Sequence, residues 1–211
     1  MLIIVRHGQS MANLTNSFAG HWDIDLSSAG KKQALESALY VSKNYKIDKI
    51  YSSDLLRAYN TAKALADIIG AEICKDSMLR EIYAGKWEGL SFDEIENNYP
   101  DEHKIWCEDI GSCRIPEGES IAELFERTTN EFIRLAKESV GKCYYVATHA
   151  TPIRSLMAYS EEKNCRIMKD IPWVTNASLT FADYENGKLV IREYGFDKHL
   201  KELKTEFPKN I

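Results

Sequence analysis

Four short apolar segments alternate with longer segments of helical periodicity along this chain of 211 residues. Strands are predicted at residues 2–5, 49–53, 71–75 and 143–148. The first is apolar throughout, as expected of a strand that is buried on both faces of a sheet. Because parallel strands need crossovers that cover the sheet faces, the alternation predicts an α/β fold, a three-layer αβα sandwich with a mostly parallel central sheet.

Two helices are predicted between the first three strands. Ser27 is a suitable N-cap for a helix over residues 28–43. One side of this helix is expected to carry Leu35, Ala38, Leu39 and Ser42. A clearer apolar periodicity covers residues 55–69 and stops at Gly70, a residue type that commonly ends helices.

The second half of the chain predicts two further long helices and a hairpin. Ser120 and Glu123 have the spacing of a capping box at the start of a helix. Pro152 suits the first turn of a helix that follows the fourth strand. Near the end, Asn186 and Gly187 separate two β-prone segments, which predicts a C-terminal antiparallel hairpin.

Residues 78–116 show a weaker pattern than the rest of the chain. A short helix is indicated before Pro100, and another around Trp106 and Cys107. We expect a single domain over residues 1–211, in which residues 78–116 form an irregular insertion that covers a site.

Composition excludes several classes of function. The net charge is −5, from 27 Lys and Arg against 32 Asp and Glu, which argues against a nucleic-acid-binding surface. No apolar run approaches the roughly 18 residues of a membrane helix, and no charged-then-apolar leader precedes the first strand. The five cysteines form no C-x-x-C pair, which argues against a disulfide framework or a structural zinc site. We expect a cytoplasmic protein with no metal, membrane or nucleic-acid partner.

Chemically active side chains follow three of the predicted strands. The first strand leads into Arg6 and His7, and the fourth leads into His149. The second leads into Ser53, with Arg57 in the first turn of the next helix. Ligands of parallel α/β sheets bind outside the carboxyl ends of the strands, so we expect these residues to converge there.

Each of these residues alone has an ordinary structural interpretation, but the combination favours an anion site. An arginine at a helix N-terminus is unfavourable unless an anion is bound beside it. Two arginines and free helix amides match the geometry of phosphate. Neutral imidazole is a good nucleophile towards phosphorus, and arginines neutralise a transferring phosphoryl group without magnesium. The carboxylate cluster that hard metal ions prefer is missing from this set.

Five segments of the sequence together resemble a known family. LIIVRHGQSMAN, SSDLLRAYNTA, REIYAGKWEG, PEGES and THATPIR occur in this order, and they closely resemble the histidine phosphatase (phosphoglycerate mutase-like) superfamily. The resemblance spans residues 2 to about 158, and FDKHL near the end is similar to a late motif of the phosphatase branch. It implies a phosphoglycerate mutase-like fold and no cofactor or metal.

The resemblance also implies roles for individual residues. His7 would be the nucleophile, and Glu81 the general acid that protonates the leaving oxygen. The transferring phosphoryl group would be bound by Arg6, Asn13, Arg57 and His149, of which His149 is also counted as catalytic. From the residues alone, LREIYAG indicates only a surface ion pair between Arg80 and Glu81. Gly8 is expected to let the backbone pass close to the phosphate.

The remaining candidates have structural interpretations. His21 and His103 are expected at the surface, and His199 in FDKHL is expected to lie outside the site. Glu119 in PEGES belongs first to a helix entry. The core or loop anchors are expected to include Trp87, Trp106 and Trp173.

The leading functional hypothesis is a metal-independent hydrolase of small phosphomonoesters that forms a phosphohistidine at His7. A cofactor-dependent phosphoglycerate mutase would use the same site. Mutases of the family typically carry a long basic insertion, whereas the segment after Glu81 is short and acidic. A non-catalytic phospho-ligand module would be expected to lack a site residue, and a zinc hydrolase would need ligands besides His7 and His149. The substrate stays open among sugar phosphates, phosphoserine, α-ribazole phosphate and nucleotides, and so does the oligomeric state.

Overall fold

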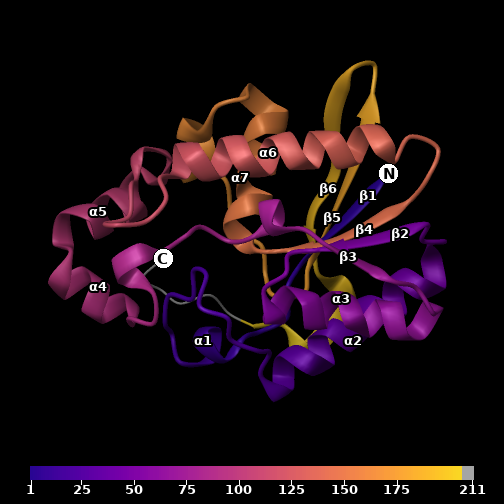
Figure 1. Cartoon of the computed structure of the whole chain (residues 1–211), viewed down its shortest axis with the longest axis horizontal. Helices are drawn as coiled ribbons and strands as arrows, with labels where there is room; N and C mark the ends of the chain where they lie inside the picture. Colours follow the sequence, from indigo (N-terminus) through magenta and orange to yellow (C-terminus); the bar gives the residue numbers. More distant parts are fainter. Residues whose placement is uncertain (206–211) are drawn as a thin grey trace.

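A six-stranded sheet forms the centre of the protein, in the order β3–β2–β4–β1–β5–β6 (Figure 1). The computed structural model describes residues 1–205. The strands are β1 (Leu2–Arg6), β2 (Lys49–Ser52), β3 (Ile73–Lys75), β4 (Tyr144–Thr148), β5 (Leu179–Glu185) and β6 (Lys188–Phe196). Strands β1 to β4 are parallel, while β5 pairs antiparallel with β1 and β6 pairs antiparallel with β5. The predicted mostly parallel sheet with a C-terminal hairpin is confirmed.

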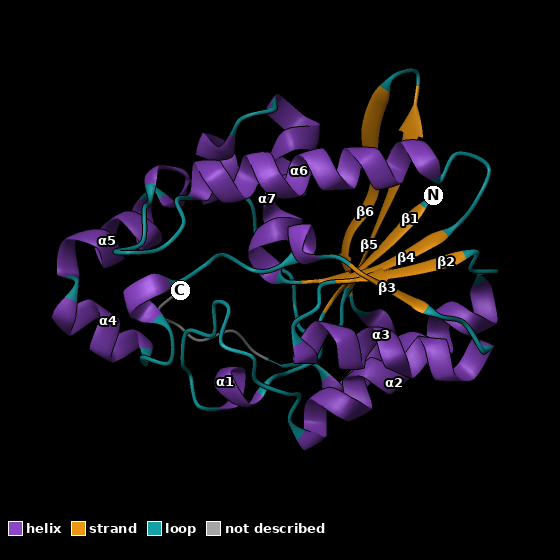
Figure 2. Ribbon diagram, in the orientation of Figure 1, coloured by secondary structure: helices purple, strands orange, loops and turns teal. Residues whose placement is uncertain are grey.

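Two pairs of helices cover the two faces of the sheet (Figure 2). One layer holds α2 (Ser28–Asn44) and α3 (Leu56–Ile69), and the other holds α6 (Ile121–Glu138) and α7 (Ala150–Glu162). Strand β1 is fully buried because its side chains alternate between two apolar clusters. Ile3 and Val5 pack with α2 and α3, while Leu2 and Ile4 pack with α6 and α7. The three-layer αβα sandwich predicted from the sequence is therefore present.

The buried face of α2 differs from the prediction. Leu35 and Leu39 are both 46% exposed, and the helix instead turns Ala34, Ala38 and Val41 towards the sheet. The reason is steric, because the small side chains let α2 lie close against α3 and the sheet. Of the predicted side, Ala38 is buried, and the other buried residues of the helix are Gly30, Gln33, Ala34, Ser37 and Val41.

The segment over residues 78–116 is more regular than the predicted irregular insertion. It contains α4 (Phe92–Asn98) and α5 (Pro100–Glu108), together with 3₁₀ turns at Gly85–Trp87 and Ile110–Ser112. We call this segment the cap, and its helices lie at one end of the molecule, beyond the carboxyl ends of the parallel strands (Figure 1). Pro100 ends α4 as expected, but it also occupies the first turn of α5.

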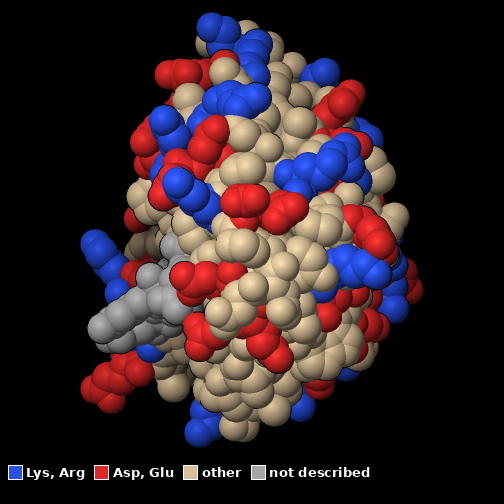
Figure 3. Space-filling model, turned by 90° about the vertical axis from the view of Figure 1, so that its left-hand side faces the viewer, with Lys and Arg blue, Asp and Glu red and all other residues tan. Residues whose placement is uncertain are grey.

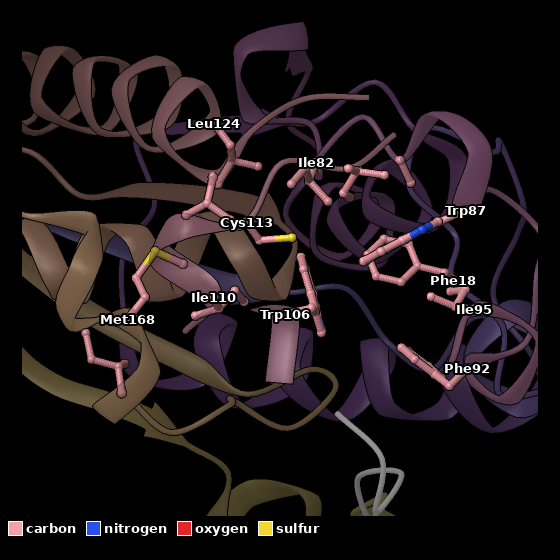
Figure 4. Close-up of a cluster of buried hydrophobic side chains, with 14 of the residues drawn as sticks. Phe18, Ile82, Trp87, Phe92, Ile95, Trp106, Ile110, Cys113, Leu124 and Met168 are labelled. Carbon is pink, nitrogen blue, oxygen red and sulfur yellow. The ribbon is translucent and has the colours of Figure 1, made fainter. Parts of the chain in front are cut away.

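The cap shares an apolar cluster with the loop after β1 and with residues of α6 and α7. The ring of Phe18 packs against three others (Figure 4). Its centroid lies 5.5 Å from that of Trp87, 5.9 Å from that of Phe92 and 5.1 Å from that of Trp106. The prediction that these tryptophans anchor a core is confirmed for Trp87 and Trp106. His103 was predicted at the surface, and this is wrong, because the packing of α5 leaves it 8% exposed with its Nε2 3.6 Å from Cys107 Sγ.

The remaining described elements are short. They are α1 (Met11–Leu14) and 3₁₀ turns at Ser77–Leu79, Cys165–Asp170 and Lys198–Leu203. All five cysteines are free thiols. Within residues 1–205, no helix combines the length and the apolar character needed to cross a bilayer.

Two glycines bring the loop after β1 against α2. A Cβ on Gly8 would lie 2.3 Å from the carbonyl oxygen of Gly30, and a Cβ on Gly30 would lie 2.0 Å from the carbonyl oxygen of Gln9. Neither distance is compatible with a side chain. Gly8 is therefore required by its approach to α2, and it does not line the pocket described below.

This contact gives a prediction for Gly30→Ala. Helix propensity alone would make the substitution stabilising by about 1 kcal/mol. We expect the steric overlap to outweigh this gain in helix propensity. The free energy of unfolding, measured by urea denaturation, should fall by about 1–3 kcal/mol. Lys32→Ala, at an exposed position of the same helix, is the control and should change it by less than about 0.5 kcal/mol. A Gly30→Ala variant that is as stable as the parent would contradict the close approach.

Candidate active site

The predicted site residues meet in one pocket at the carboxyl ends of β1 and β4. The pocket has a volume of about 880 Å³ with its open mouth included. Of the expected catalytic and phosphate-binding residues, those that line it are Arg6, His7, Asn13, Arg57 and Glu81, and two of the expected anchors, Trp106 and Trp173, line it as well. The ring of His149 lies immediately behind, with its centroid 5.1 Å from that of His7. The expected convergence is confirmed.

His7 is fixed in one tautomer by its own loop. Its Nδ1 lies 2.7 Å from the carbonyl oxygen of Gly8, which can only accept, so Nδ1 carries the proton. The lone pair is therefore on Nε2. Burial and the nearby charges of Arg57 and Arg6 hold the pKa of His7 well below its usual range, so that the imidazole is neutral.

His149 is buried beside His7, and its ring contacts a residue that follows a different strand of the sheet. Its Nε2 lies 2.9 Å from the hydroxyl of Ser53, the residue that follows β2. Its Nδ1 is buried without a hydrogen-bond partner in the described residues. Burial and the charge of Arg57 hold its pKa well below the usual range. An unsatisfied buried nitrogen of this kind is costly unless a ligand completes it.

Arg6 and Arg57 bring two buried positive charges to the pocket. Their side chains are 7% and 1% exposed, and burial lowers the pKa of each to about 10, so both remain charged at neutral pH. Arg57 donates to the carbonyl oxygens of Gly20 (2.7 Å) and Trp22 (3.1 Å), while its buried Nε finds no partner among the described residues. Arg6 donates to Val174 O. Backbone carbonyls thus aim the guanidinium groups without neutralising them.

Neutral donors also lie at the end of the pocket that holds Arg6 and Arg57, which we call the phosphate end after the ligand expected there. Helix α7 begins at Ala150, directly after His149, and its first residues line the pocket, so the positive end of the helix dipole faces it. The carboxamide oxygen of Asn13 accepts from Ser10 N (3.0 Å) and from Asn176 Nδ2 (3.2 Å). This orients the Asn13 amide and leaves its NH₂ group as the part that can contact an anion.

Glu81 lies at the pocket wall on an irregular stretch of the cap. Its carboxylate accepts from its neighbour's backbone, Ile82 N, at 2.9 Å, and from Thr151 N at 3.4 Å. The surface ion pair indicated between Arg80 and Glu81 is wrong, because Arg80 forms a bidentate pair with Asp54. Because Arg80 is paired with Asp54, it does not bind the Glu81 carboxylate, and Glu81 lines the pocket.

The backbone around Glu81 is held by Arg127, which had no sequence signal, together with Glu119 of the PEGES segment, which was expected first at a helix entry. Arg127 of α6 donates to the carbonyl oxygens of Met78 (2.9 Å), Arg80 (3.1 Å) and Glu81 (3.3 Å). Glu119 accepts two hydrogen bonds from Arg127, at 2.9 and 2.8 Å. The PEGES segment is thus both a helix entry and a support of the site, and its Glu119 was the signal that could have identified this network.

Two further histidines can now be placed. His21 was predicted at the surface, but it is half-buried, and its Nε2 donates to the carbonyl oxygen of Glu81 at 2.9 Å. The prediction that His199 lies outside the site is consistent with its position behind α2, where its ring contacts Ser37 and Ala177. Asn176, which also binds His7 O at 3.1 Å, had no sequence signal. Within residues 1–205, no cluster of His, Cys, Asp and Glu has the geometry to hold a metal ion.

Comparisons with known proteins agree with this arrangement. The family model described as "Histidine phosphatase superfamily (branch 1)" matches residues 2–197. The chain is 33% identical over 204 residues to phosphoglycerate mutase-like protein 4 of Arabidopsis thaliana, covering 95% of this chain and 87% of that protein. It is 31% identical to phosphoserine phosphatase 1 of Hydrogenobacter thermophilus, covering 100% of this chain and 99% of the relative.

A solved structure is similar over nearly the whole fold. It is that of a mutant phosphoserine phosphatase from Entamoeba histolytica in complex with phosphoserine. The TM-score is 0.82 at 28% sequence identity, covering 94% of this chain and 98% of that one. With a family model that matches almost the entire chain, and with relatives of this identity and coverage, the protein belongs to branch 1 of the histidine phosphatase superfamily.

Proposed function

We propose that this protein hydrolyses phosphomonoesters through a phosphohistidine intermediate on His7, without a metal ion. The observation that carries the proposal is a neutral, buried imidazole with its Nε2 lone pair available beside two charged arginines. Imidazole must be neutral to attack phosphorus, and the arginines keep it so while they attract the phosphate dianion.

The first step transfers the phosphoryl group to the enzyme. His7 Nε2 forms a bond to phosphorus as the bond from phosphorus to the alcohol oxygen breaks. Arg6, Arg57 and the amides at the start of α7 stabilise the charge on the three equatorial oxygens. Glu81, in its protonated form, gives its proton to the departing oxygen, so that an alcohol leaves and not an alkoxide.

The second step returns the enzyme to its starting state. Water attacks phosphorus, the carboxylate of Glu81 takes up a proton from it, and the bond between Nε2 and phosphorus breaks to release inorganic phosphate. His149 lies beside the same phosphoryl position, and its unpartnered Nδ1 is suited to a hydrogen bond with a phosphate oxygen. Ser53 orients its ring for this role.

Hydrolysis is favoured over the mutase reaction by the charges of the pocket. A mutase must hold a second anionic group of phosphoglycerate while the phosphoryl group is returned. Among the described residues that line the pocket, Arg6 and Arg57 are the cationic ones, and both lie at the phosphate end. A purely binding role is disfavoured because the nucleophile, the acid candidate and the phosphate ligands are all present.

The proposal predicts a phosphoenzyme that depends on His7. Rapid quench of the wild-type protein with ³²P-labelled substrate should trap an acid-labile, alkali-stable phosphoprotein. His7→Ala should form none and should lose activity by a factor on the order of 10³–10⁶. Excess chelator should leave wild-type turnover unchanged.

Several outcomes would contradict this proposal. A His7→Ala variant with substantial turnover would exclude His7 as the nucleophile, and loss of wild-type activity in chelator would indicate a metal enzyme. Fast conversion of 3- to 2-phosphoglycerate with negligible release of phosphate, in the presence of bisphosphoglycerate, would establish the mutase instead.

A second prediction tests Glu81 as the proton donor. Glu81→Gln should lower kcat by about 10²–10⁴-fold with an alkyl phosphate, whose leaving group needs a proton. The loss should be much smaller with 4-nitrophenyl phosphate, whose leaving group departs as a stable anion. Glu117→Gln, at an exposed position of the PEGES segment, is the control and should behave like wild type with both substrates. Equal losses with the two substrates would assign Glu81 to binding and not to proton transfer.

A third prediction follows from the neutral histidines. The unfolded chain takes up a proton on each imidazole near pH 6.5, whereas folding keeps His7 and His149 unprotonated to lower pH. The unfolded state therefore binds more protons, and the free energy of unfolding should fall as the pH decreases below about 6.5, by up to about 1.4 kcal/mol per pH unit for each group. Urea denaturation in phosphate-free buffer between pH 7.5 and 5.5 measures this. His149→Gln should show a shallower decline, and an unchanged slope would mean that His149 is not buried in its neutral form.

A further inference from the structure

Beyond the phosphate end, the wall of the pocket is aromatic. Phe18, Phe92, Trp106 and Trp173 all line it. The rings of Phe18 and Trp106 have centroids 5.1 Å apart, and those of Trp106 and Trp173 are 6.1 Å apart with an angle of 31° between their planes. Figure 4 shows Phe18, Phe92 and Trp106 side by side in the cap cluster. The leaving group of a bound ester would lie against this surface.

Trp173 is held in place from behind by a buried arginine. The guanidinium carbon of Arg154 lies 3.9 Å from the centre of the Trp173 ring. Arg154 is 3% exposed and donates to the carbonyl oxygens of Ile171 (3.0 Å) and Met168. It lines a separate pocket, which shares Trp106 and Trp173 as a wall with the catalytic one. Its charge therefore supports the indole ring and is not presented to the substrate.

The charges around the aromatic wall disfavour binding of a substrate that carries a second anionic group besides its phosphate. Apart from the two arginines at the phosphate end, the described lining residues include no Lys or Arg. Helices α4 and α5, which supply Phe92 and Trp106, carry one lysine, Lys104, against six carboxylates: Asp93, Glu94, Glu96, Asp101, Glu102 and Glu108. On the face of the molecule at this end, acidic and basic side chains are interspersed, and no continuous basic patch is visible (Figure 3).

We propose that the preferred substrate is the phosphomonoester of an uncharged alcohol that carries a flat apolar group, such as an aromatic ring. This rests on the proposed hydrolase function and specifies its substrate class. The apolar group is desolvated against Trp173 and Phe18, and neutral hydrogen bonds to the alcohol are available from Asn16 and Ser17 at the wall.

The free energy of desolvation separates this substrate class from esters that carry a carboxylate. A carboxylate placed against the aromatic wall loses water without gaining a cationic partner, and the acidic cap repels it. Phosphoserine, which is part of the name of the Hydrogenobacter relative, carries such a carboxylate next to an ammonium group, and both would lose water against the aromatic wall. We therefore expect this chain to discriminate against phosphoserine despite the similarity.

A panel of three alkyl phosphates separates the gain in binding from an apolar group from the loss caused by a carboxylate. Benzyl phosphate supplies a flat apolar group, glycerol 3-phosphate supplies a small neutral polar group, and 3-phosphoglycerate adds a carboxylate to nearly the same skeleton. All three alcohols are poor leaving groups, so binding and not intrinsic reactivity decides the order. We expect kcat/KM for benzyl phosphate to exceed that for glycerol 3-phosphate by about tenfold or more. The value for 3-phosphoglycerate should be lower still.

Variants test the wall directly. Trp173→Ala should lower kcat/KM for benzyl phosphate about tenfold more than it lowers that for glycerol 3-phosphate, mainly through KM. Tyr184→Ala is the control: this half-buried aromatic lies at the far end of β5, away from the pocket, and its removal should leave the ratio unchanged.

The outcomes distinguish this inference from the proposed function. Hydrolysis of 3-phosphoglycerate or phosphoserine at least as efficient as that of benzyl phosphate would overturn the inference and leave the hydrolase intact. An unchanged substrate ratio in Trp173→Ala would overturn it equally. Absence of phosphate release from every ester would overturn both.

Discussion

Desolvation of ionisable side chains is the constraint on which the rest of the site depends. Arg6, His7, Arg57 and His149 are all nearly inaccessible to water and lie within one cluster. Because charged imidazoles would be repelled by the arginines, the histidines stay neutral and the net positive charge resides on the guanidinium groups. We expect a phosphate dianion to bind here, because its negative charge would offset the two buried positive charges. The burial that makes two like charges costly on their own is thus expected to favour the binding of one class of anion.

The sequence predicted the parts of this site that depend on topology. The carboxyl ends of parallel strands must meet at one edge of the sheet, so the proximity of His7, His149 and Arg57 followed from strand order and chain direction. The family resemblance added roles for Asn13 and Glu81, which periodicity alone could not supply. Their positions in the pocket agree with those roles, and the roles themselves stay predictions.

Contacts between segments distant in the sequence could not be predicted. Arg127 donates hydrogen bonds to the backbone of residues 78–81, and Arg80 pairs with Asp54. Both contacts depend on how the cap packs against α6 and against the loop after β2. No local pattern in the sequence indicates which residues far apart along the chain will form such pairs. The buried face of α2 was predicted only in part. Ala38 is buried as expected, but hydrophobicity also favoured Leu35 and Leu39, whereas the helix packs through smaller side chains such as Ala34.

The support of Glu81 by Arg127 has a mechanical consequence. His7, the proposed nucleophile, follows a strand of the sheet, whereas Glu81, the proposed acid, belongs to the cap. Arg127 of α6 donates hydrogen bonds to the backbone of the cap. A displacement of the cap would therefore move the proton donor while leaving the phosphate ligands of the sheet in place. If the proposed roles are right, we expect substitutions at the contact between the cap and α6 to change turnover more than phosphate affinity.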